Sequence, residues 1–168
     1  RGLGDVYKRQ VITPVVCCSG DTLASVDMLL DTIVYMLPSA SERPGEPKKE
    51  EYIKYEEDKP LSAFVFKTVA DPFVGKMSFI KVVQGRLNVN SPIVNATTGE
   101  SEKPGKLLTL KGKKQEEMTE ACAGDIVVVT KLNANTNDTL CDPSNVSQYV
   151  PILFPQPCFF KGIAAVNK

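Results

Sequence analysis

The hydrophobic pattern separates an α/β segment near the start of the chain from a longer run of β-strands. The first apolar run, Val11 to Ser19, is short, β-branched and almost continuously apolar. This pattern is typical of a strand buried on both faces of a parallel sheet. Gly20-Asp21 then interrupts the run.

An amphipathic helix is predicted next, because apolar residues recur every three or four positions from Leu23 to Leu37. Asp21 or Thr22 is placed to cap its start. Pro38 ends it, since the residue before a proline avoids the helical region. One strand and one helix leave an apolar face uncovered, so we expect residues 11–38 to be the end of a larger α/β domain that begins upstream.

Residues 39–59 change to a polar character. From Glu42 to Lys59, seven acidic and five basic residues fill 18 positions, and prolines flank Gly45. This composition predicts a solvated linker.

Beyond Pro60 the pattern is that of a β domain. Turn residues such as Asp71-Pro72 and Gly124-Asp125 separate seven short apolar runs. This spacing predicts a mainly β fold over residues 60–143, as a small closed barrel or a sandwich. A further strand-like piece, Cys158–Val166, predicts that residues 144–168 open another domain. The seven runs are 61–70, 77–84, 92–96, 106–110, 118–121, 126–132 and 139–141.

The composition excludes several kinds of catalytic and metal-binding site. The chain has no His, which excludes Ser-His-Asp and Cys-His nucleophiles and imidazole zinc sites. Its five Cys form no C-x-x-C pair, which favours free thiols in the cytosol. No apolar stretch approaches the length of a membrane-spanning helix. The sequence contains no phosphate-binding glycine loop and no paired carboxylates at a defined spacing, so we expect no catalysis by this chain alone.

Basic residues suggest one candidate binding surface, although 20 Lys and Arg balance 20 Asp and Glu. Loop lysines are often merely solvated, but they can also neutralise phosphates without reading bases. We therefore take a local patch as a candidate contact with a nucleic-acid backbone. Its members are Lys76, Arg86, Lys111, Lys113 and Lys114.

Residues 1–10, Arg-Gly-Leu-Gly-Asp-Val-Tyr-Lys-Arg-Gln, show no helical or strand periodicity and join abruptly to the apolar run. They resemble translated adapter sequence and are then no part of the fold; the alternative is a genuine polar loop.

The middle of the chain resembles domain II of the elongation factor G family of translational GTPases. The matching stretches are Pro60–Phe79, Gly85-Arg-Leu, Ala123-Gly-Asp-Ile and Asn137-Asp-Thr-Leu-Cys-Asp-Pro. The family usually has Thr-Gly where this chain has Thr136-Asn137. Flanking stretches agree in order. Val15-Val-Cys-Cys-Ser-Gly is similar to the close of the GTPase domain, and Phe154-Pro-Gln-Pro to the entry into domain III.

The resemblance implies a translation-factor barrel preceded by a strand-helix remnant of a GTPase domain. By position, Ser19 and Gly20 correspond to the family's Ser-Ala pair, which backs the guanine base of GTP or GDP. The phosphate loop, the switches and the Mg²⁺ ligands would lie upstream. The implied parent is a cytoplasmic, monomeric GTPase that contacts the ribosome and its small-subunit ribosomal RNA and promotes translocation. A ribosomal protection protein, a GTPase like release factor three, or a stand-alone β-barrel binding module are the alternatives.

Overall fold

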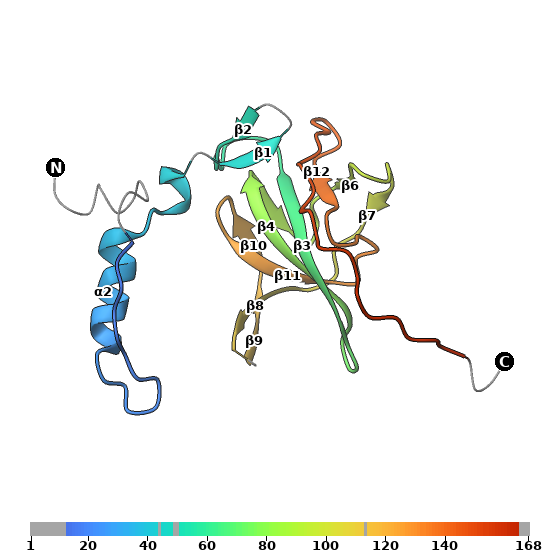
Figure 1. Cartoon of the computed structure of the whole chain (residues 1–168). Helices are drawn as coiled ribbons and strands as arrows, with labels where there is room; N and C mark the ends of the chain where they lie inside the picture. The colour runs from blue at the N-terminus through green and yellow to red at the C-terminus, as the bar shows by residue number, and fades with distance from the viewer. Residues whose placement is uncertain (1–12, 44, 49–50, 113, 165–168) are drawn as a thin grey trace.

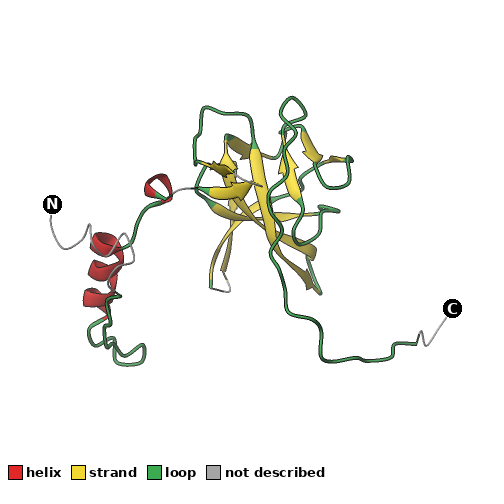
Figure 2. Cartoon of the chain, turned by 45° about the horizontal axis from the view of Figure 1, so that its top comes forward, coloured by secondary structure: helices red, strands yellow, loops and turns green. Residues whose placement is uncertain are grey.

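The computed structural model describes residues 13–43, 45–48, 51–112 and 114–164, and it is mainly β (Figure 1). This confirms the fold class predicted from the strand pattern. Figure 2 shows the β domain on one side and the helical segment on the other, with the linker between them. The segment assigned to adapter sequence, residues 1–10, lies outside the described residues.

The helix near the start, α2, spans Val26–Met36, and none of its residues is buried. Its N-cap is Ser25, in the left-handed conformation (φ 57°) and without a side-chain cap, whereas Asp21 and Thr22 were the predicted caps. Those two residues lie in a preceding turn instead. At the other end Leu37 is extended before Pro38, as the proline predicts.

The predicted buried strand before α2 does not form within the part of it that is described. Residues 13–19 belong to no helix or strand, and Val15 is 87% exposed. A strand needs a neighbouring strand to receive its backbone hydrogen bonds, and the described residues supply none here.

The polar segment 39–59 contains more structure than a solvated linker. A 3-10 turn spans Ala40–Glu42, and a two-stranded antiparallel sheet joins β1 (Glu46–Lys48) to β2 (Glu51–Ile53). Ile53 and Tyr55 then pack against the buried cluster of Phe64, Val83 and Tyr149. This hairpin is therefore anchored on the outer face of the β domain.

The β domain is one eight-stranded antiparallel sheet plus a two-stranded sheet of β5 and β10. The order in the large sheet is β7-β6-β12-β3-β4-β11-β8-β9. The strands are β3 (Ser62–Asp71), β4 (Gly75–Gln84), β5 (Arg86–Asn88), β6 (Ile93–Asn95), β7 (Ser101–Glu102), β8 (Leu107–Lys111), β9 (Lys114–Met118), β10 (Glu120–Cys122), β11 (Ile126–Thr130) and β12 (Thr139–Cys141).

One apolar cluster fills the inside of this domain and draws residues from both sheets. Val65, Ile80 and Val129 are completely buried in it, together with Leu87 of β5 and Ala121 of β10. The large sheet must curl for its inner face to meet the small sheet around a single core, and Figures 1 and 2 show this curvature. The long strands β3 and β4 alternate between this core and the outer clusters, as the period of two requires.

After β12 the chain returns along the outside of the domain and then leaves it (Figure 1). Tyr149 is 4% exposed, whereas every residue from 151 to 164 is exposed. The strand predicted from Cys158 onwards does not form up to residue 164, which again fits the lack of a partner strand among the described residues.

Candidate functional site

The first candidate region is the turn that precedes α2. The Ser19 amide donates to the carbonyl of Ala24 at 3.0 Å, and the Ser19 hydroxyl accepts a hydrogen bond from the Thr22 amide at 3.2 Å. Gly20 is exposed, and a Cβ added to it would meet no described atom within 4 Å. The turn therefore presents an open backbone at Gly20, with Ser19 held in place behind it.

The second candidate region is the β8–β9 hairpin, which carries two of the five predicted cations. Lys111 and Lys114 pair across the hairpin and share one carboxylate, Glu116, at 2.9 and 3.1 Å. These lysines lower the pKa of Glu116. Two positive charges against one negative charge leave the hairpin end with a net positive charge. Lys113 lies between them in sequence, outside the described residues.

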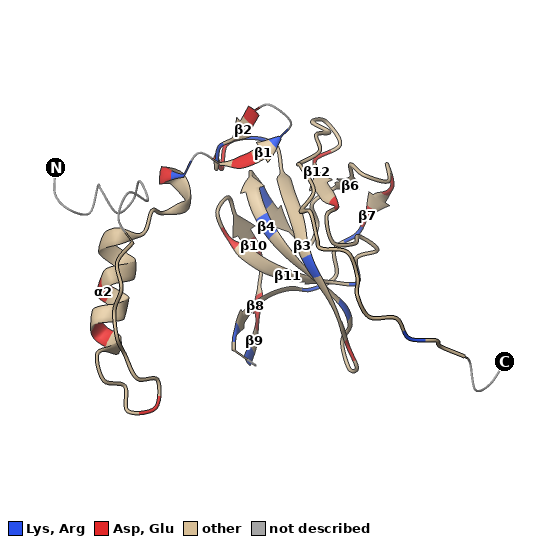
Figure 3. Cartoon of the chain, viewed as in Figure 1, with Lys and Arg blue, Asp and Glu red and all other residues tan. Residues whose placement is uncertain are grey.

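Of the remaining two predicted cations, Lys76 lies near the start of β4 and Arg86 opens β5, and both are engaged with other parts of the β domain. Lys76 donates to the carbonyl of Asn133 at 2.8 Å and to the side-chain oxygen of Asn135 at 2.9 Å. Arg86 forms ion pairs with Glu57 at 2.8 Å and Glu120 at 2.6 Å, and the bond to Glu120 raises the pKa of Arg86. Acidic and basic positions are interspersed along the domain in Figure 3.

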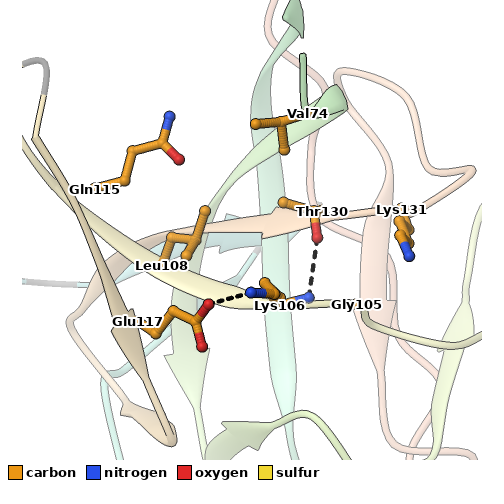
Figure 4. A pocket seen from close by; sticks show the side chains of 8 residues that line it. All are labelled: Val74, Gly105, Lys106, Leu108, Gln115, Glu117, Thr130 and Lys131. Atoms are coloured by element: carbon orange, nitrogen blue, oxygen red, sulfur yellow. Dashed lines mark hydrogen bonds and ion pairs between the residues drawn. The ribbon is translucent and has the colours of Figure 1, made fainter.

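A groove next to the β8–β9 hairpin adds residues beyond the five predicted cations. It has a volume of about 590 Å³ and lies between Val74 of the β3–β4 turn and Leu108 and Gln115 of the hairpin (Figure 4). Lys106 pairs with Glu117 at its wall, and the Lys106 amide donates to Thr130 Oγ1 at 2.9 Å. Lys131 also lines the groove and is exposed.

The β3–β4 turn beside this groove presents an aromatic ring to solvent. Phe73 is 97% exposed. Its turn is held by Asp71, which accepts hydrogen bonds from the amides of Phe73 and Val74, both at 2.8 Å, and these bonds lower the pKa of Asp71. The Asp71-Pro72 turn was visible in the sequence, but the exposure of the following ring was not.

Comparison with known proteins places this arrangement in a family. The family described as "Elongation factor G domain 2" matches residues 60–143, which is half of the chain. The chain belongs to the elongation factor G family. A curated relative from Syntrophomonas wolfei subsp. wolfei, named "Elongation factor G 2", is 37% identical over 167 aligned residues. That alignment covers 94% of this chain and 24% of the relative, so the chain spans about a quarter of the relative's length.

A solved structure supports the same fold for this elongation factor G fragment. A crystal structure of a protein from Thermus thermophilus superposes with a TM-score of 0.66 at 26% identity. It covers 91% of this chain, which in turn corresponds to 22% of that protein. No helix in the described part is long and apolar enough to cross a membrane. The described residues also contain no group of three or more His, Cys, Asp or Glu side chains able to hold a metal ion.

Proposed function

We propose that this chain is the part of a ribosome-dependent GTPase that forms the guanine-side turn and the ribosome-facing barrel, in a parent that promotes translocation in the cytoplasm. The elongation factor G relationship over 94% of the chain is the observation that carries this proposal. The proposed division is residues 11–38 for the end of the GTPase domain, 39–59 for the connection, 60–143 for domain II and 144–168 for the start of domain III.

The open turn suits the guanine side of a GTP or GDP site. A backbone amide can donate to a base oxygen only if no side chain blocks it, and Gly20 has free space around it. The hydroxyl of Ser19 holds the turn through Thr22. In this proposal the turn contributes base recognition alone, and the phosphates and Mg²⁺ of the parent are held by residues outside this chain.

The β8–β9 hairpin suits contact with small-subunit ribosomal RNA. Lys111 and Lys114 are exposed at its end and are only half neutralised by Glu116. Lysines of this kind bind phosphates by charge and make the affinity depend on salt. In this proposal Lys76 and Arg86 are further RNA contacts, although each already has partners within the chain: Lys76 bonds to Asn133, and Arg86 pairs with Glu57 and Glu120.

The test measures binding of the 168-residue chain to purified small ribosomal subunits at several salt concentrations. We expect Lys111→Gln with Lys114→Gln to weaken binding and to reduce the slope of log affinity against log salt by about one for each lysine. Lys54→Gln with Lys59→Gln is the matched control, since it removes the same charge from two exposed lysines in the segment between β2 and β3. Equal slopes for the two double variants would refute the assignment of the hairpin as the RNA contact.

A further inference from the structure

The chain leaves the β domain through a short anchored segment, residues 149–152, which we term the strap. The Tyr149 amide donates to Thr139 Oγ1 at 3.0 Å, and its phenol bonds to the Ser62 hydroxyl. The Val150 amide donates to the carbonyl of Pro47 at 3.1 Å. The strap therefore touches both β12 and the β1–β2 hairpin before the chain departs (Figure 1).

The last anchored residue of the strap is held by a side chain. The Asn137 side-chain nitrogen donates to the carbonyl of Ile152 at 3.1 Å, and the Asn137 side-chain oxygen accepts from the Ile152 amide at 2.9 Å. One primary amide thus satisfies both backbone groups of one residue, as a neighbouring strand would. From Leu153 to residue 164 the described chain is exposed.

The base of this contact is rigid. The Asn137 amide donates to the carbonyl of Val65, on the long strand β3, at 2.8 Å. The buried Asp138 carboxylate accepts from the Asn135 amide at 2.7 Å and from the Asn95 side chain at 2.8 Å. The turn that carries Asn137 is thereby fixed to the domain on both sides.

The backbone at Asn137 would favour glycine. Its φ is 80°, in the left-handed region where glycine is unstrained and Asn is tolerated. Glycine would relieve the backbone but could make neither side-chain bond to Ile152. An asparagine here therefore gains a contact at a small backbone cost.

We propose that Asn137 is a positioning residue that latches the strap and thereby fixes the direction in which residues 153–164 leave the β domain. The latch depends on the side-chain amide and is independent of whether the chain binds ribosomes. If Asn137 served only to adopt its left-handed backbone, glycine would replace it without loss.

The experiment measures amide hydrogen exchange on the full 168-residue chain. In Asn137→Gly we expect the Ile152 amide to exchange about tenfold faster, because two hydrogen bonds are lost. We also expect faster chymotrypsin cleavage after Leu153, whereas the Phe154–Pro155 bond resists the protease in every variant. Asn137→Asp keeps the acceptor but sets a carboxylate against the Ile152 carbonyl, so an intermediate loss is expected. Asn145→Gly is the control, since the Asn145 side chain has no bond among the described residues.

The exchange of the position-137 amide, which bonds to Val65, reports whether the turn itself is intact. Unchanged Ile152 protection in Asn137→Gly with the turn intact would overturn the proposal. If the glycine variant loses the turn, Asn137→Asp decides: faster Ile152 exchange supports the latch, and unchanged exchange overturns it.

Discussion

The protonated side chain of Tyr149 stabilises the β domain, and we expect this one contribution to be lost in alkaline solution. Its side chain is buried and packs edge-on against Phe64 with ring centroids 6.1 Å apart, while its hydroxyl bonds to Ser62. Burial raises the pKa of Tyr149 to about 12, compared with 10 for an ordinary tyrosine. The folded chain therefore holds the phenol proton to a higher pH than the unfolded chain does.

The sign of the effect follows from proton linkage. Between pH 10 and pH 12 the unfolded state has lost the proton and the folded state keeps it, so the free energy of unfolding falls as the pH rises. At pH 12 this loss amounts to about 2 kcal/mol. The contribution is fully present below pH 10.

Replacing Tyr149 by phenylalanine removes this titration but leaves the Ser62 hydroxyl, 1% exposed, without its bond to Tyr149. At about pH 8 we therefore expect Tyr149→Phe to unfold about 1–2 kcal/mol more easily than the wild-type chain. As the pH rises toward 12, the titration of Tyr149 lowers the free energy of unfolding of the wild type alone. The difference in stability between the wild type and Tyr149→Phe therefore becomes smaller. Urea unfolding followed by circular dichroism from about pH 8 to about pH 11.5 measures both curves.

Tyr52→Phe is the control, because Tyr52 is 63% exposed and lies on the β1–β2 hairpin. Its stability curve should stay parallel to that of the wild type. Parallel curves for Tyr149→Phe as well would refute the reasoning, since they would mean that the Tyr149 phenol titrates alike in the folded and unfolded chains.

The sequence predicted the long strands well, because the alternation of inward and outward side chains is visible in the strand residues themselves. β3 and β4 alternate over ten residues each and meet at the Asp71-Pro72 turn. By contrast β9, Lys-Gln-Glu-Glu-Met, has no buried residue and is an edge strand, so no apolar period marks it. The β1–β2 hairpin is also mostly polar, and only Ile53 at its end and Tyr55 just after it indicate that it packs on the β domain.

The sequence indicated which residue types form the candidate site, but it did not indicate which side chains they pair with. That Lys111 and Lys114 are exposed followed from the charge pattern, yet their shared Glu116 depends on the hairpin register. Arg86 meets Glu57 and Glu120, which are 29 and 34 residues away in the chain, so its ion pairs depend on the tertiary fold. The Asn137 latch joins two residues that are 15 positions apart, across β12 and the irregular segment after it, and sequence periodicity does not predict such a contact.

Two further substitutions test the polar groups of the β domain. The Ser78 hydroxyl is buried without a hydrogen-bond partner among the described residues, so Ser78→Ala should raise the free energy of unfolding by about 1 kcal/mol in urea; a decrease would show that the hydroxyl has a partner. Glu46 accepts hydrogen bonds from Lys81 and Tyr55, both at 2.5 Å. Burial works to raise the pKa of Glu46, but these bonds outweigh it and hold the pKa below its usual 4.5. The stabilisation is therefore present at neutral pH and is lost as the pH falls through the lowered pKa. Glu46→Gln should cost about 1 kcal/mol at neutral pH and little in acid, because it removes the charge that holds the hairpin on β4. Glu51→Gln changes an exposed glutamate on the same hairpin. If it destabilised the chain equally, the stabilisation would come from the general charge of the hairpin and the specific role of Glu46 would be refuted.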